Sequence, residues 1–153
     1  MSTDAVSVRG EAAEVALGEA QAVLAHVADR ERRGRLADLI AAVQGGEVAG
    51  DDAEALEEIL ELGLQTGRLR AVYGPGGEQA ALRLYRKLPR GQELGSSTRA
   101  VSDAVSALEG CRLERVALQS VGPGAFLLTL AAGGRELSLR LDRQGARIAS
   151  ASA

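Results

Sequence analysis

The amino-acid sequence predicts an α+β protein in which an N-terminal helical region of four to five helices packs on a C-terminal four-stranded antiparallel β-meander. Before Gly110 the apolar residues recur every three to four positions, as on one face of a helix. After it they alternate along short runs that are separated by glycine turns. In addition, three successive hairpins place their leucines on the same face of the sheet, and such agreement between independent turns supports the meander.

The chain has 153 residues, which suits one compact unit with a sizeable core. We expect a disordered tail over residues 1–10, a helical region over 11–95, and a helix followed by the meander over 96–153. The aromatic residues are Tyr73, Tyr85 and Phe126, so aliphatic side chains and alanine must form the core. For the same reason the protein offers almost no aromatic rings on which a nucleic-acid base or a sugar could stack.

Two apolar stripes predict the first two helices. The first helix runs from Glu11 to Asp29 and carries several alanines, which allow a close approach to a neighbour. The next stripe begins at Leu36. If both stripes belonged to one continuous helix, they would lie on opposite sides of it. We therefore expect the chain to bend near Gly34. The second segment ends at Gly45-Gly46, since glycine commonly follows the last helical turn.

A third helix begins at Asp51 or Asp52, whose carboxylate can accept hydrogen bonds from the free backbone N–H groups of the first turn. It ends near Gly67. Its inward stripe consists of Leu56, Ile59, Leu60 and Gly63. Its outer face consists of Glu57, Glu58 and Glu61, which we interpret as a solvated acidic surface rather than a metal site, because no histidine lies nearby.

Two structures are compatible with the segment from Arg68 to Arg90. In the first, the glycine-rich loop at 74–77 opens a helix that ends at Pro89, and the helix-forming residues after the loop favour this alternative. In the second, residues 68–73 and 80–84 are two strands of a hairpin, which would form a winged helix with the third helix. A last helix then runs from Ser97 or Thr98 to Leu108.

Glycine turns predict the register of the sheet. Gly133-Gly134 is a two-residue hairpin turn, 122–124 is a three-residue loop, and 142–145 holds the last turn. The resulting pairs on one face are Leu130 with Leu137, Leu128 with Leu139, Phe126 with Leu141, Leu141 with Ala146, Leu139 with Ile148, Leu118 with Leu128, and Val116 with Leu130. We expect the preceding helix to cover this apolar face.

The sequence contains no constellation that predicts catalysis, a cofactor or a metal ion. The single histidine, His26, has no visible partners for either role and is interpreted as a surface or structural residue. Cys111 has no activating base beside it and is expected to behave as a small buried hydrophobe. The Gly74–Gly77 string lacks the lysine and hydroxyl of a phosphate-binding loop and is interpreted as a tight turn.

Charge is unevenly distributed along the chain. Residues 1–67 carry 14 acidic and 5 basic groups, whereas residues 68–99 carry 7 basic and 2 acidic groups. This asymmetry indicates either an internal electrostatic contact or separate surfaces, with solvated helix faces as the simplest interpretation. The basic side chains that we single out as a partner-binding surface are Arg68, Arg70, Arg83, Arg86, Lys87 and Arg90.

These observations favour a non-enzymatic interaction or scaffold protein that binds another protein and self-associates, with a dimer as the simplest assembly. One alternative is a module that binds a small molecule in a cavity between helices and sheet. Another is a winged-helix-like nucleic-acid-binding regulator, although the acidic third helix and the scarcity of lysine argue against nucleic acid as a partner.

The sequence also predicts the surroundings of the protein. Its single cysteine cannot form an internal disulfide, and its first residues have no secretion signal, so we expect a cytoplasmic protein. Almost all of the basic residues are arginine rather than lysine, which is typical of a GC-rich bacterial genome. No apolar run approaches the roughly 20 residues that cross a membrane, so we expect no membrane contact.

Overall fold

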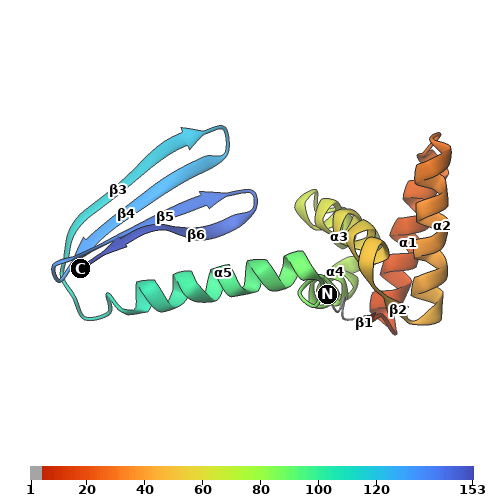
Figure 1. Ribbon diagram of the computed structural model, residues 1–153, viewed down its shortest axis with the longest axis horizontal. Helices are drawn as coiled ribbons and strands as arrows, with labels where there is room; N and C mark the ends of the chain where they lie inside the picture. Colours follow the sequence, from red (N-terminus) through yellow and green to blue (C-terminus); the bar gives the residue numbers. More distant parts are fainter. Residues whose placement is uncertain (1–4) are drawn as a thin grey trace. The chain divides into compact units, whose positions relative to one another are not determined.

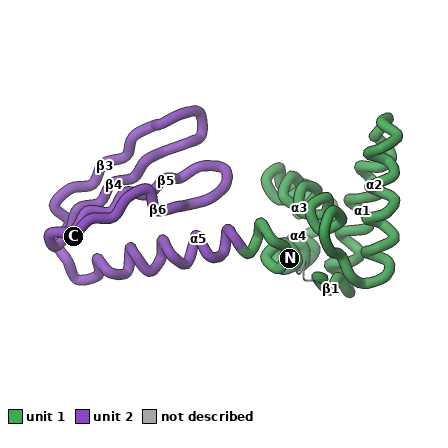
Figure 2. Tube along the Cα trace, viewed as in Figure 1, with its two compact units in different colours: residues 1–92 green, residues 93–153 purple. Residues whose placement is uncertain are grey.

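The computed structural model describes residues 5–153 and confirms the α+β layout, with five helices followed by a four-stranded antiparallel sheet. Contacts divide the chain into two compact units, Met1–Gln92 and Glu93–Ala153, where the sequence led us to expect one (Figure 2). The division falls within α5 (Pro89–Ser106), in which Gly91 is the buried residue. Each unit has its own buried apolar side chains, for example Leu56 in unit 1 and Leu137 in unit 2.

Unit 1 begins with a short strand rather than with a disordered tail over residues 1–10. Val6 pairs with Val48, and the Val8 N–H donates to the carbonyl of Gly46 at 2.9 Å. Val8 itself is buried, and that burial offsets the entropy lost on ordering the segment. The first four residues of the expected tail lie outside the described part of the chain. The elements of the unit are β1 (Val6–Ser7), α1 (Glu11–His26), α2 (Arg30–Gly45), β2 (Glu47–Val48), α3 (Gly50–Gln65) and α4 (Arg68–Tyr85) (Figure 1).

The chain turns between α1 and α2 at residues 27–29, earlier than the bend expected at Gly34. Asp29 decides the position, because its side chain accepts a hydrogen bond from the backbone N–H of Arg32 at 2.7 Å and so begins a new helix. Gly34 then lies inside α2, where a glycine costs about 1 kcal/mol relative to alanine without breaking the helix. The expected end at Gly45-Gly46 is confirmed.

Segment 68–85 is helical on both sides of the glycine-rich loop, so the hairpin alternative and the winged helix that depends on it are wrong. Gly74 has φ +72° and kinks α4 in the middle, a conformation that glycine adopts readily. The first turns are helical because Leu69 is fully buried against α3, where a methyl group on Gly63 would lie 2.8 Å from Leu69 Cγ.

Pro89 begins a helix instead of ending one. At the first helical position proline loses no hydrogen bond, because the N–H of that residue has no partner within the helix. The next N–H, that of Arg90, donates to the carboxylate of Glu57 on α3. Gly91 passes so close to Tyr85 that a methyl group on it would overlap the Tyr85 carbonyl oxygen.

The core of unit 1 is aliphatic, as the scarcity of aromatic residues requires. Its helices contact one another through leucine, valine and alanine, with the most extensive packing between α1 and α2, α1 and α4, and α3 and α4. The most deeply buried large side chains on these helices and on the link to α5 are Val15, Leu39, Leu56, Leu60, Leu69 and Leu88.

Unit 2 is a meander whose registers confirm the predicted ones. Its strands are β3 (Leu113–Gly122), β4 (Ala125–Ala132), β5 (Arg135–Asp142) and β6 (Gly145–Ser152), and they are bonded in that order. Every predicted pair on the apolar face is present. The first loop is tighter than expected, because Gly122 pairs with Ala125 and an irregularity between Ser120 and Gly122 absorbs the extra residue.

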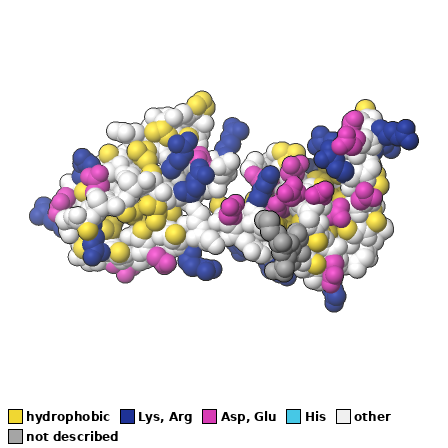
Figure 3. Space-filling view, in the orientation of Figure 1, with side chains coloured by type: hydrophobic (Ala, Val, Ile, Leu, Met, Phe, Trp, Pro, Cys, Tyr) yellow, Lys and Arg dark blue, Asp and Glu magenta, His cyan; other side chains and the backbone are white. Residues whose placement is uncertain are grey.

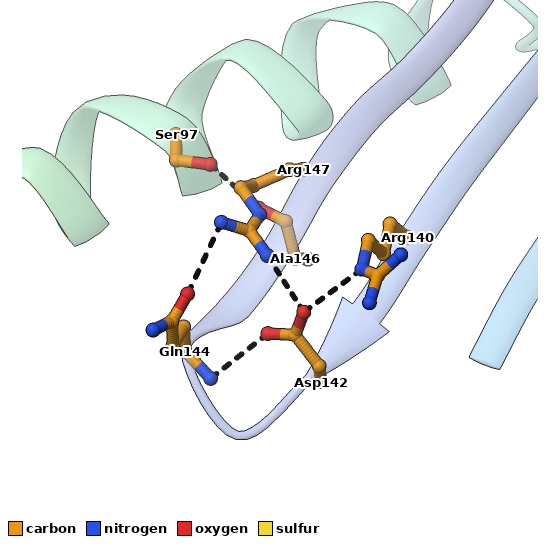
Figure 4. A network of polar contacts seen from close by, with 6 residues as sticks. All are labelled: Ser97, Arg140, Asp142, Gln144, Ala146 and Arg147. Carbon is orange, nitrogen blue, oxygen red and sulfur yellow. Dashed lines mark hydrogen bonds and ion pairs between the residues drawn. The ribbon is translucent and has the colours of Figure 1, made fainter. Parts of the chain in front are cut away.

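Asp142 stabilises the last hairpin (Figure 4). Its carboxylate accepts hydrogen bonds from Arg140 at 3.1 Å, from Arg147 at 2.6 Å and from the backbone N–H of Gln144 at 2.9 Å. The Arg140 guanidinium, followed by the Gln144 N–H, holds the pKa of this carboxyl below its usual range. At the same hairpin the Ser97 hydroxyl of α5 donates to the carbonyl of Ala146 at 2.6 Å, so α5 lies against β6.

The apolar face of the sheet is covered only at its centre, although the sequence led us to expect full cover from the preceding helix. Leu137 and Leu139 on β5 are each 4% exposed. On β3, by contrast, Val116 is 57% exposed and Leu118 is 61% exposed. The half-buried side of α5, with Val101 and Ala104, faces the sheet near β6 and leaves β3 open.

Replacing Gly91 with alanine should destabilise the protein strongly. The added methyl group has no room beside the Tyr85 carbonyl, and the backbone atoms there are held by packing. We expect Gly91→Ala to lower the free energy of unfolding by at least about 2 kcal/mol, measured by urea denaturation with circular dichroism.

Gly95→Ala is the matched control, because Gly95 lies in the same helix with open space around it. This change should be neutral or should raise the free energy of unfolding by up to about 1 kcal/mol, as expected for alanine in a helix. Equal effects of the two substitutions would contradict the close contact at Gly91.

Candidate functional site

A groove of about 760 Å³ lies on unit 1, between α1, α2 and α3, and extends to the start of α4. Most of its lining is apolar and comes from all three helices. The apolar residues that form its floor include Val23, Val27, Leu36, Ala55, Ile59 and Leu62. Leu62 is 62% exposed, which makes it the most exposed large aliphatic side chain in the described part of the chain.

The groove exists because the first turns of α2 carry no apolar side chains. Residues 30–35 are polar, glycine or charged, and each of them is exposed. They therefore supply no apolar side chain to cover the space between the second half of α1 and the outer side of α3. Farther along α2, Leu39 is apolar and fully buried.

Helix α3 supplies two apolar stripes, and this explains why its exposed leucine was not predicted as part of a site. Ala53, Leu56 and Leu60 form the buried stripe that packs in the core. Ala55, Ile59 and Leu62, at spacings of four and three residues, form a second stripe that faces the groove. The width of this apolar surface is visible in the sequence, but only the structure shows which stripe remains uncovered.

Charged groups border the groove. Arg32 and Arg35 stand on the α2 side and Glu58 stands on the α3 side. Arg35 has only a weak contact with Glu31, at 3.8 Å between two exposed side chains, so its charge is available to a ligand. His26, on α1, is exposed, and its Nδ1 lies 2.8 Å from the Ala22 carbonyl oxygen, which agrees with the surface role expected for it.

An ion pair between the buried Glu19 and the half-exposed Arg68 borders the groove. The carboxylate of Glu19 is 3% exposed, and Arg68 Nε donates to both of its oxygens, at 2.9 and 3.2 Å. The hydrogen bond to Glu19 raises the pKa of Arg68 above its usual value. Burial, followed by the nearby Glu19 charge, raises the pKa of Tyr73. The pair neutralises a carboxylate that would otherwise be buried alone, at a cost of several kcal/mol.

The six basic residues singled out from the sequence differ in their contacts. Arg68 borders the groove, Arg70 pairs with Glu78 at 3.4 Å, and Arg90 pairs with Glu61 at 3.4 Å. The other three, Arg83, Arg86 and Lys87, are exposed at the end of α4 and just beyond it, and no ion pair holds them within the described residues.

Glu57 was expected on a solvated acidic face and is instead buried, at 1% exposure. It faces inward because its carboxylate accepts the Arg90 N–H at the beginning of α5, where the helix dipole favours a negative charge. Burial nevertheless raises the pKa of Glu57, with small contributions in the same direction from Glu54 and Glu61, and contacts with Arg90 oppose the shift.

The remaining sequence candidates are dispersed. Cys111 is exposed rather than buried, and Gly74–Gly77 forms the kink within α4 rather than a separate loop. Within residues 5–153, no group of three or more histidine, cysteine or acidic residues is arranged to hold a metal ion. Across the same residues, no helix is long and apolar enough to cross a membrane.

No match to this chain was found among protein-family models, curated proteins or solved structures.

The raised pKa of Glu57 predicts a pH dependence. The unfolded chain releases this proton near its ordinary value of 4.5 and the folded protein releases it at higher pH. The stability that the protonated carboxyl contributes is therefore fully present below pH 4.5 and is lost as pH rises through the folded pKa. Glu57→Gln keeps an oxygen for the Arg90 N–H but does not titrate, so its stability relative to wild type should increase from pH 4 to pH 7.

Urea denaturation of both proteins at several pH values measures this difference. Glu57→Ala, which leaves the Arg90 N–H without its acceptor, should be less stable than Glu57→Gln by about 1–3 kcal/mol at every pH. If the difference in free energy of unfolding between wild type and Glu57→Gln stays constant from pH 4 to pH 7, this result would contradict the raised pKa of Glu57.

Proposed function

We propose that this chain is a non-enzymatic adaptor or scaffold protein, in which unit 1 holds an amphipathic helix of a partner protein and the chain associates with a second copy of itself. The observation that carries the first part is the groove on unit 1, with its apolar floor and its charged borders. Grooves of this kind bind helices whose apolar residues recur at i, i+3, i+4 and i+7.

The charges around the groove define the chemistry of the partner helix. Its apolar stripe would lie on Leu36, Ile59 and Leu62, where each side chain gains contact with carbon atoms. Acidic residues on one flank of the helix would meet Arg32 and Arg35 on α2. A basic residue on the other flank would meet Glu58, so the groove favours one orientation of the bound helix.

A binding role is also favoured by the state of the most deeply buried acid in the groove. Arg68 Nε donates to both carboxylate oxygens of Glu19, so the charge of this acid is already paired within the chain. The same contact joins α1 to the start of α4 at the groove. A contact that already exists in the free protein suits recognition, because less ordering is needed when a partner binds.

The exposed basic residues Arg83, Arg86 and Lys87 offer a second, weaker contact for an acidic segment of a protein partner. Arginine suits this purpose because its guanidinium binds carboxylates through two hydrogen bonds. We propose a cytoplasmic site of action, since the exposed thiol of Cys111 is best preserved in a reducing compartment.

Binding of a small molecule is the second candidate function. A volume of about 760 Å³ lies in the range of small-molecule sites, which is roughly 300–1,000 Å³. The site favoured is now the groove within unit 1, in place of a cavity between helices and sheet. Native mass spectrometry of the purified protein should show an adduct of a few hundred daltons in this case, and Leu62→Glu should remove that adduct.

The proposed helix binding can be tested with a designed peptide. The probe is a fluorescein-labelled helix of leucine, alanine and glutamate, with leucines along one stripe and glutamates on one flank. A second probe carries lysine in place of glutamate. We expect the acidic probe to bind more tightly in fluorescence anisotropy, because it faces Arg32 and Arg35.

Leu62→Glu should weaken binding of the acidic probe at least tenfold, since it removes an apolar contact and adds a repelling charge. A loss of about 1.4 kcal/mol is enough for this factor. Val72→Glu is the matched control, because Val72 is similarly exposed on α4 and lies outside the groove. Equal affinity of the two variants would show that the groove is not the binding surface.

A further inference from the structure

Strand β3 is an edge of the sheet, bonded to β4 on one side and to no other strand within the described residues. Its pairing with β4 is regular from Arg115 to Ser120, and irregularities lie at both ends of that stretch. Along the outer side of this stretch, backbone N–H and C=O groups point away from the sheet. Such a row of unsatisfied groups is a template on which another strand can pair.

The exposed apolar side chains of β3 favour contact with a second strand at this edge. Val116 and Leu118 lie on the same face of the sheet and are more than half exposed, and Phe126 on β4 continues the exposed surface. Figure 3 shows hydrophobic side chains gathered over the sheet of unit 2. A second strand beside β3 would cover part of this surface while it pairs with the backbone.

Along its regular stretch, the edge also lacks the features that usually prevent pairing with another strand. Residues 115–120 include no proline and no lysine. The one charged side chain there, that of Arg115, reaches inward over β4 to Glu136 on β5, at 2.7 Å. Its charge therefore stands over the sheet rather than beyond the edge, where it would repel an incoming strand.

The opposite edge of the sheet is less suited to pairing. Strand β6 has an irregularity near Ala149, between the pairs formed by Ser138 and Leu139. Its first residues are contacted by α5, through the Ser97 hydroxyl and the carbonyl of Ala146 (Figure 4). Of the two edges, β3 is therefore the open one.

We infer that two copies of this chain associate through β3, by antiparallel pairing about a two-fold axis that passes at Ala117. This inference rests on the self-association included in the proposed function and names its surface. The pairing would join the two sheets into one sheet of eight strands. A two-fold axis uses the same edge of both copies, so one self-complementary strand is sufficient.

The sequence of β3 selects this register and a second copy as the partner. With the axis at Ala117, Val116 lies opposite Leu118 of the second copy, twice, and Arg115 lies opposite Gln119 of the second copy. With the axis at Leu118, Val116 would oppose a serine. With the axis at Val116, Glu114 would oppose a leucine, and with the axis at Arg115, two arginines would face each other.

Cysteine cross-linking tests the register directly, in a Cys111→Ser background that removes the natural thiol. Across an antiparallel pair, opposite Cα atoms are about 4.5–5.5 Å apart, which a disulfide can span. Ala117→Cys should therefore form a covalent dimer under mild oxidation. Gln119→Cys is the matched control on the same face of the same strand, and its two copies would stand about 13 Å apart, beyond the reach of a disulfide.

A covalent dimer from Ala117→Cys and none from Gln119→Cys supports the inference. Equal cross-linking at both positions, or none at Ala117, overturns it. A dimer that forms from Leu118→Cys but not from Ala117→Cys overturns the proposed register as well.

Light scattering separates this inference from the proposed function. The natural chain should be a dimer, and Leu118→Glu should convert it to a monomer while it still binds the acidic peptide probe. Leu62→Glu, at an equally exposed leucine of unit 1, should stay dimeric while it loses the probe. A dimer that survives Leu118→Glu overturns the role of β3 and leaves self-association standing, whereas a monomeric natural chain overturns both.

Discussion

Both units have more apolar surface than their own elements can cover, and the two surfaces that we assign to binding follow from this constraint. In unit 2 the outer strands of four are separated by three spacings of about 4.8 Å, or about 14 Å, whereas one helix is about 10 Å wide. The single helix α5 can therefore cover the strands nearest to it. Leu137 and Leu139 are buried as a result, and Val116 and Leu118 remain exposed. In unit 1 the same shortage arises at the first turns of α2, whose polar residues leave the second apolar stripe of α3 open.

The two buried charges of unit 1 are used for internal contacts. Glu19 and Glu57 are buried, and each meets a basic residue from the arginine-rich segment that follows α3. A buried carboxylate without a partner would cost several kcal/mol, so these contacts hold α1 to α4 and α3 to the start of α5. Part of the charge asymmetry along the sequence, namely Arg68 and Arg90 with their acidic partners, therefore reflects the assembly of the helices. Within the arginine-rich segment that follows α3, Arg83, Arg86 and Lys87 have no ion pair among the described residues and are left for an external partner.

The sheet could be predicted almost completely from the sequence, because glycine turns restrict the register locally and the alternation of side chains repeats that information in each hairpin. Leu128, for example, is aligned with Leu139 by one turn and with Leu118 by another. The helix ends were harder to predict, because Pro89 can begin a helix as well as end one. Its role depends on Glu57, which is more than 30 residues away in the sequence. The groove depends on the same kind of distant relation, since it brings Leu62 of α3 together with the charged first turns of α2, which carry no apolar side chain to cover it.

The two proposed surfaces are independent in composition, and this independence matters for a scaffold. The groove is lined by residues of unit 1 and the β3 edge belongs to unit 2, so the two surfaces share no side chain. A substitution in one surface therefore removes no side chain of the other. A dimer formed through β3 would carry two grooves. A partner with two suitable helices would then bind the second groove at a high effective concentration, and its overall affinity would exceed that of either groove alone. Binding to two grooves at once would thus compensate for a modest affinity of each.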